Sequence, residues 1–205
     1  MRDLVILVPG VGFAGAELLP LAMRLRLKGY RVSVFWHRTG ILPLQDSAQR
    51  LWDKATKQSE DVVHFVGHSL GGLVVLRMLA DHRWDRSGRV VTMGTPHAGL
   101  SAARWLARLP GCRRLLGPGI LAAADGDPIA VSPDREFGVL AGDRDLFLGS
   151  VLASGRASDT LISVAETRHS GSREHVVVSE THVGMLFAGR VASHIDSFLR
   201  EGRFG

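Results

Sequence analysis

The chain has 205 residues, of which 45% are hydrophobic and 22% charged, and its formal net charge is +5 at pH 7. These values are ordinary for a soluble globular protein and predict one domain with a sizeable core. No apolar segment is long enough to cross a bilayer, no nucleic-acid motif accompanies the positive charge, and one cysteine excludes an intrachain disulfide. That cysteine, Cys112, fits a reducing compartment, so we expect a cytoplasmic protein.

The first part of the chain predicts a buried strand, a glycine-rich loop and a helix. The continuous apolar run from Leu4 to Val8 is typical of a strand covered on both faces. Pro9 and the glycines after it interrupt the apolar stretch, which argues against a signal peptide. Residues 17–28 have helical periodicity, and Gly29 is expected to end that helix.

The rest of the chain alternates strand and helix patterns, which predicts a parallel α/β sheet with helices on both faces. Residues 110–135 are rich in glycine and proline, so we expect a cap-like excursion near 99–135 with one short helix. Residues 142–159 are expected to form a loop, and 160–167 a helix or turn. In such sheets the working site lies at the carboxyl ends of the strands. The other expected strands are 31–36, 62–66, 89–93, 137–141 and 176–179, and the other expected helices are 44–59, 70–80, 101–109 and 183–200.

The segment Gly67-His68-Ser69-Leu70-Gly71 lies between the strand at 62–66 and the helix that follows it. A strand that turns at once into a helix strains the central residue and exposes its side chain, which is the geometry of a nucleophile elbow. We therefore predict Ser69 as a nucleophile, with the N–H of Leu70 at the helix start binding an oxyanion. The alternative is a glycine-rich turn with an idle serine.

A serine nucleophile needs a base, and His182 is the best placed of nine histidines. It follows the last expected strand and precedes the closing helix, at the same sheet edge as Ser69, although a helix cap or surface histidine is the alternative. Three others have specific expected positions. We expect His64 in the buried strand, His68 pointing away from the serine, and His97 lining the pocket. Five more are expected at the surface or in loops: His37, His82, His169, His175 and His194.

The base needs a carboxylate that holds its tautomer and stabilises the imidazolium. Asp143, Asp145 and Asp159 all fit the order serine, acid, histidine. Asp143 is nearest to a strand end, whereas Asp159 lies in a polar turn before an apolar run. Position alone leaves this choice open.

These segments resemble the α/β-hydrolase superfamily, and more narrowly its small bacterial lipases and esterases, over nearly the whole chain. The matching motifs are Gly67-His68-Ser69-Leu70-Gly71-Gly72, Gly94-Thr95-Pro96-His97-Ala98-Gly99, Thr181-His182-Val183-Gly184-Met185-Leu186 and Ser158-Asp159-Thr160.

The resemblance implies a Ser69, Asp159 and His182 triad, and it favours Asp159 over Asp143. It also implies that the N–H of Val11 joins that of Leu70 in the oxyanion hole. Two positions depart from the family pattern: Pro9-Gly10 stands where His-Gly is usual, and Thr160 where glycine is usual.

The function expected from these residues is a serine carboxylic-ester hydrolase of the minimal α/β-hydrolase type, acting on short to medium acyl esters without a cofactor or metal. Phe13, Pro96 and His97 are expected to contact the substrate. Thioester hydrolysis or acyl transfer would use the same triad, and a non-catalytic binding protein would keep the same fold. The expected apolar groove is lined by Val11, Phe13, Ala14, Pro96, Leu100, Trp105, Leu106, Ile120 and Leu121.

The positive charge of the chain is scattered, and its densest region carries four arginines, at 104, 108, 113 and 114. A solvated helix face is one interpretation, and weak contact with an anionic membrane surface is the other. The expected partner is a small-molecule or lipid ester, and the sequence makes no prediction about the oligomeric state.

Overall fold

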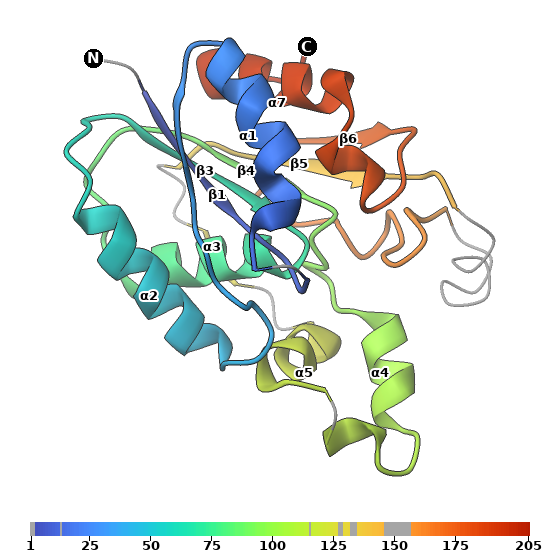
Figure 1. Ribbon diagram of the computed structural model, residues 1–205. Coiled ribbons are helices and arrows are strands. Elements are labelled where there is room, and N and C mark those ends of the chain that lie inside the picture. Colours follow the sequence, from blue (N-terminus) through green and yellow to red (C-terminus); the bar gives the residue numbers. More distant parts are fainter. Residues whose placement is uncertain (1–2, 13, 115, 127–128, 132–134, 146–156) are drawn as a thin grey trace.

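The structure, a computed structural model, describes residues 3–12, 14–114, 116–126, 129–131, 135–145 and 157–205. Its core is a six-stranded sheet in the order β2-β1-β3-β4-β5-β6, and every pair of neighbouring strands is parallel (Figure 1). The predicted α/β class is confirmed. The strands are β1 Leu4–Val8, β2 Arg31–Val34, β3 Val63–His68, β4 Val90–Met93, β5 Phe137–Gly142 and β6 Glu174–Val178.

Helices cover both faces of the sheet, as the fully buried β1 requires (Figure 1). Because successive side chains of a strand point to opposite faces, Val5 and Leu7 enter one core cluster and Leu4, Ile6 and Val8 enter the other. The first cluster includes side chains of α1 and α7, and the second includes those of α2, α3 and α5. These helices are α1 Leu19–Leu27, α2 Leu44–Thr56, α3 Leu70–Asp81, α5 Pro118–Asp125 and α7 Gly189–Glu201.

The described part of the segment between β4 and β5 contains the helix expected at 101–109 and the short helix expected in the excursion. α4 spans Ser101–Ala107, a 3-10 turn η2 spans Cys112–Arg114, and α5 follows. Figure 1 shows α4 and α5 below the sheet. The guanidinium of Arg104 donates from Nη2 to the carbonyl of Ala124 at 2.8 Å, which ties α4 to α5.

The closing helix is shorter than predicted, because the expected helix at 183–200 is broken. A 3-10 turn η3 covers Gly184–Leu186, and α7 begins only at Gly189. Between them Ala188 is extended, with φ −77° and ψ 124°. Glycine at 184 and 189 lowers the helix propensity of this segment, and the N–H of Gly184 is held by the hydroxyl of Thr181 at 3.0 Å.

Other boundaries differ by a few residues. α1 is preceded by a 3-10 turn η1 at Ala16–Leu18, and it ends before Gly29, whose φ is 102°. β6 begins two residues before the expected strand, and residues 160–167, expected to form a helix or turn, form turns and bends.

Candidate active site

The turn at Ser69 has the strained geometry that the sequence pattern predicts. Ser69 has φ 53° and ψ −129°, between the last residue of β3 and the first residue of α3. A residue with a Cβ atom rarely adopts a positive φ, so contacts with neighbouring residues must hold Ser69 in this conformation. Its N–H donates to the carbonyl of Met93 at 2.8 Å, and its carbonyl accepts the hydroxyl of Thr95 at 2.8 Å.

Glycines let the backbone segments around Ser69 approach one another closely. A Cβ atom at Gly67 would lie 2.5 Å from the Cα atom of Gly72, and one at Gly71 would overlap the carbonyl oxygens of Val8 and Pro9. A Cβ atom at Gly10 would lie 2.7 Å from that of Ser69. The loop after β1 therefore lies directly against the elbow.

The carboxylate of Asp159 and the imidazole of His182 form a buried pair. Nδ1 of His182 lies 2.6 Å from Oδ2 of Asp159, and the N–H of His182 donates to the carbonyl of Asp159 at 2.7 Å. Oδ1 of Asp159 accepts the N–H groups of Leu161 and Ile162, at 3.1 and 2.9 Å. With the carboxylate of Asp159 as the acceptor, Nδ1 of His182 donates the hydrogen and Nε2 keeps its unshared electron pair.

Gly94 connects this pair to Ser69. A Cβ atom at Gly94 would lie 2.9 Å from both Oδ2 of Asp159 and Nδ1 of His182. Gly94 directly follows Met93, whose carbonyl holds the N–H of Ser69. Met93 and Gly94 thus connect the backbone of Ser69 with the Asp159 and His182 pair at the carboxyl edge of the sheet.

Asp143, another of the three carboxylates considered, directly follows the strand β5 at this edge. Its N–H donates to the carbonyl of Val178 at 3.1 Å, and its side chain is exposed. The geometry therefore pairs His182 with Asp159.

The two predicted oxyanion donors flank the elbow. Leu70 is the first residue of α3, so its N–H has no acceptor within the helix. Val11 directly follows Gly10 in the loop that lies against Ser69. A Cβ atom added at Gly40 would lie 2.9 Å from a Val11 methyl group, 3.2 Å from Ile120 and 3.5 Å from Leu70. Side chains of both predicted donor residues thus meet at Gly40. The role of their N–H groups in binding an oxyanion stays a prediction.

The three predicted substrate contacts have different surroundings. Phe13 lies outside the described residues, and Pro96 is buried. His97 is buried as well, with Nε2 2.9 Å from the hydroxyl of Thr92 and its ring against Phe137. Pro96 and His97 line a small cavity of about 90 Å³ together with residues of α2, α3 and α5. Substrate contact at these positions stays a prediction.

Two histidines differ from expectation: His37 is more buried, and His68 makes a contact that the sequence did not reveal. His37, expected at the surface, is buried, and its Nε2 lies 2.9 Å from the hydroxyl of Ser47. His68 is buried next to Ser69, and its Nε2 lies 3.1 Å from the carbonyl oxygen of His182. The only sequence signal for this second contact is the position of His68 immediately before the predicted nucleophile.

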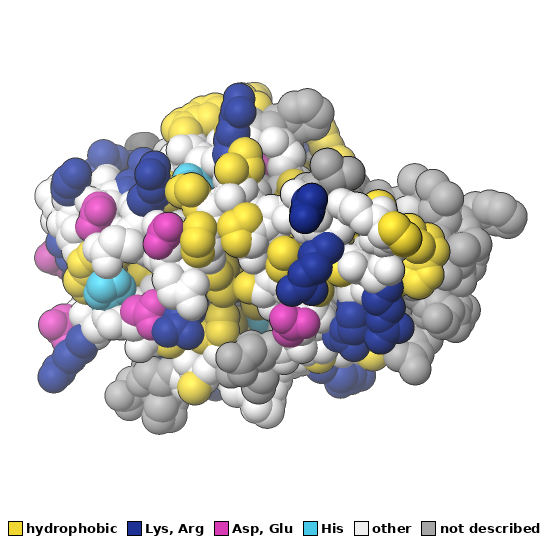
Figure 2. Space-filling view, turned by 90° about the horizontal axis from the view of Figure 1, so that it is seen from below, with side chains coloured by type: hydrophobic (Ala, Val, Ile, Leu, Met, Phe, Trp, Pro, Cys, Tyr) yellow, Lys and Arg dark blue, Asp and Glu magenta, His cyan; other side chains and the backbone are white. Residues whose placement is uncertain are grey.

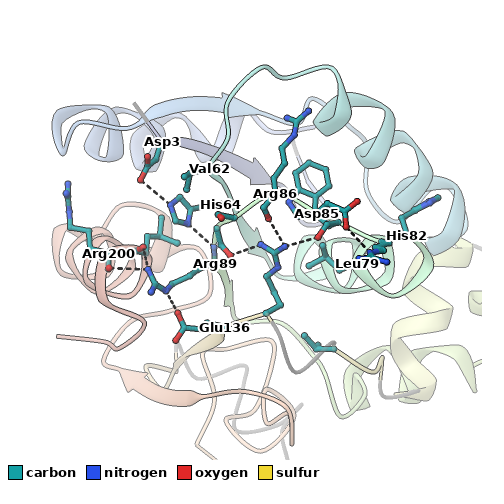
Figure 3. Close-up of a pocket in the computed structure, with 17 residues that line it drawn as sticks. Asp3, Val62, His64, Leu79, His82, Asp85, Arg86, Arg89, Glu136 and Arg200 are labelled. Carbon is teal, nitrogen blue, oxygen red and sulfur yellow. Dashed lines mark hydrogen bonds and ion pairs between the residues drawn. The ribbon is translucent and has the colours of Figure 1, made fainter. Parts of the chain in front are cut away.

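A cavity of about 890 Å³ lies away from this site, around the start of β1 and the loop before β4 (Figure 3). Its arginines are engaged by the protein itself. Arg86 donates to the carbonyls of Gln58 and Thr56 at 2.7 and 3.2 Å, and Arg135 donates to those of Gly88 and Arg86 at 2.6 and 2.9 Å. These bonds tie together the loops that line the cavity.

The face of the molecule seen from below carries apolar side chains along its middle, with lysine and arginine side chains beside them (Figure 2). Val11 and Ile41 are each more than half exposed, as is Trp105 on α4. Of the four clustered arginines, Arg104 is engaged with Ala124. The predicted contact with an anionic membrane stays a prediction.

Within the described ranges, no helix is both long and apolar enough to cross a membrane. Among the same residues, no group of three or more His, Cys, Asp or Glu side chains is arranged to hold a metal ion.

No model of a protein family and no curated protein sequence matches the chain. Solved structures do match it. The mature form of the Bacillus licheniformis lipase BlEst2 is 19% identical with a TM-score of 0.73, over 99% of this chain and 93% of that one. The pyrethroid hydrolase PytH is 16% identical with a TM-score of 0.66, over 97% of each chain.

A third match, the metagenomic carboxyl esterase MGS0156, is 19% identical with a TM-score of 0.64, over 88% of this chain and 64% of that one. These likenesses concern architecture, because the identities are low. Together with the parallel six-stranded sheet and the turn at Ser69, they show that the chain has the α/β-hydrolase fold.

Proposed function

We propose that the protein is a serine carboxylic-ester hydrolase in which Ser69 is the nucleophile, His182 the general base and Asp159 the acid that orients the base. The observation that supports this most is the strained backbone of Ser69 close to Gly94. The hydrogen-bonded pair of Asp159 and His182 lies against the same glycine. The names of the structurally similar proteins, a lipase, a carboxyl esterase and a pyrethroid hydrolase, agree with this reaction class.

The chemistry follows from the hydrogen positions. As Oγ of Ser69 attacks the ester carbonyl carbon, Nε2 of His182 takes the hydroxyl proton, and Asp159 stabilises the imidazolium. The carbonyl oxygen becomes an oxyanion that the N–H groups of Val11 and Leu70 bind. Collapse of this intermediate breaks the ester C–O bond, and His182 returns the proton to the leaving alcohol. Water, deprotonated by His182, then releases the acid and restores Ser69.

The substrate class follows from the side chains near the oxyanion donors. Val11, Leu70 and Ile120 gather around Gly40, so a carbonyl bound there places its acyl chain against apolar atoms. Each methylene buried on such a surface contributes about 0.8 kcal/mol. We therefore propose short to medium acyl esters as the substrates.

The test is hydrolysis of acetyl, butyryl, octanoyl and palmitoyl p-nitrophenyl esters by the wild type and by Ser69→Ala. We expect kcat/KM to rise from acetyl to a short or medium chain, and Ser69→Ala to remove turnover and labelling by a fluorophosphonate. Unchanged turnover in Ser69→Ala with an unchanged circular dichroism spectrum would rule out the assignment. The corresponding acyl thioesters, offered in competition, distinguish a thioesterase.

A further inference from the structure

His68 contacts His182 in the folded protein, although the two are 114 residues apart in the chain. It is the last residue of β3 and directly precedes Ser69. Its Nε2 lies 3.1 Å from the carbonyl oxygen of His182. A carbonyl oxygen only accepts, so Nε2 of His68 carries the hydrogen and donates.

This bond completes the hold on the backbone of His182. The N–H of His182 donates to Asp159, and its carbonyl accepts from His68. Asp159 and His182 both come from segments next to β5 and β6, whereas His68 belongs to the central strand β3, and β4 and β5 lie between β3 and β6 in the sheet. Among the described side chains, His68 is therefore a direct link from the strand of the nucleophile to the backbone of the base.

The environment of His68 keeps it a neutral donor. Its ring is buried and lies against that of His182, with centroids 4.7 Å apart and planes tilted by 42°. Burial, followed by the charge of a protonated His182, lowers the pKa of His68 to about 3. His68 thus keeps its hydrogen bond without competing for the proton that His182 carries during turnover.

We propose that His68 is a positioning residue, which holds the backbone of His182 at a fixed place relative to Ser69. Its catalytic consequence rests on the proposed ester hydrolysis, because positioning matters only if His182 serves Ser69. The structural consequence is that the hydrogen bond between Asp159 and His182 keeps a fixed geometry, and this can be measured without a substrate.

The experiment compares three substitutions at position 68. His68→Phe keeps a buried ring without a donor, His68→Gln can place an amide N–H where Nε2 stands, and His68→Asn carries an amide that is too short to reach. His64→Phe is the matched control, since His64 is a buried histidine of the same strand whose Nδ1 accepts the N–H of Arg89. All variants are first compared in thermal unfolding and assayed where they are folded.

We expect kcat to fall in His68→Phe and His68→Asn by about 10²-fold, the effect of a small misplacement of a catalytic group, with KM within about twofold. His68→Gln should recover most of kcat, and His64→Phe should keep it. In proton NMR spectra, the downfield signal of the Nδ1 hydrogen between His182 and Asp159 should persist in His68→Gln and shift or broaden in His68→Phe and His68→Asn.

Wild-type kcat and an unshifted NMR signal in both His68→Phe and His68→Asn would overturn the proposal, as would equal losses in His68→Gln and His68→Phe at equal thermal stability. If the wild type hydrolyses no ester, the proposed function fails, and the NMR comparison alone decides whether His68 positions His182.

Discussion

Ser69 is held in a backbone conformation that costs free energy, with φ 53° and ψ −129°. Such strain is typically about 1–3 kcal/mol for a residue with a Cβ atom. Ser69→Gly removes that Cβ atom, whereas Ser69→Ala keeps it. We expect Ser69→Gly to be more stable than Ser69→Ala by about 1 kcal/mol after the entropy cost of glycine is deducted, with both inactive. Urea unfolding curves measure this difference, and a more stable alanine variant would show that the conformation is not strained.

The two candidate acids make a second test at this scale. Asp159 is buried and bonded to His182, so Asp159→Asn should reduce kcat by about 10⁴-fold through the wrong imidazole tautomer. Asp143 is exposed, and Asp143→Asn should leave kcat within about twofold. Steady-state kinetics of the two variants decide between them, and the opposite ranking would transfer the role to Asp143.

The sequence anticipated individual residues only where a pattern constrains them. The pattern of strand, turn and helix around Ser69 predicted its strained turn, because so sharp a turn leaves no room for Cβ atoms at the flanking positions and glycines stand there. The spacing left three acids open, since loops do not reveal which carboxylate turns inward. His68 and His37 were missed as buried contacts because the direction of a side chain at a strand end depends on its neighbours in space.

At the scale of elements, α3 packs against the loop after β4 through Gly72. A Cβ atom at Gly72 would overlap the hydroxyl of Thr95, which itself holds the carbonyl of Ser69. We expect Gly72→Ala to destabilise the protein by about 1–3 kcal/mol, as overpacking does, and to reduce kcat by moving the elbow. In the control Gly12→Ala, the nearest neighbour of the new Cβ atom, Glu17, lies 3.7 Å away. Equal stability of both variants by urea unfolding would contradict close packing at Gly72.

Elements with a continuous apolar pattern were predicted best from the sequence. The buried strand β1 agrees with its expected range, and α1 ends before Gly29 as predicted. The break before α7 was missed because the apolar periodicity continues across Phe187 and Ala188. Only the contacts of the Thr181 to Gly184 turn show why the chain changes direction there.

At the scale of the whole molecule, buried histidines make stability depend on pH. Burial is the main cause that lowers the pKa of His64 to about 4, and those of His68 and His97 to about 3. In the unfolded chain these groups titrate near the usual value of about 6.5. Below that pH the unfolded state binds more protons than the folded state, so their contribution is full above pH 6.5 and is lost as pH falls toward 4.

We therefore expect the free energy of unfolding to fall by up to about 1.4 kcal/mol per pH unit for each of these histidines between pH 6.5 and 4. His97→Gln removes one of these titrating groups, so the free energy of unfolding should fall less steeply with pH, by the contribution of one proton. Urea unfolding at several pH values measures the slope. A free energy of unfolding that is constant over this range would show that these histidines titrate normally in the folded state.

The positions of the strands mean that loss of catalytic activity would reveal the local opening of β6 at the margin of the sheet. Ser69 follows β3, which has a neighbour on each side. His182 follows β6, which among the described strands pairs with β5 alone, at the margin of the sheet. Marginal segments open at a lower free energy than the whole domain. Activity should therefore disappear at a lower urea concentration than the circular dichroism signal, and the amides of β6 should exchange with deuterium before those of β3. The protein would then stop working before it unfolds, and coincident midpoints would show that β6 opens only with the rest of the sheet.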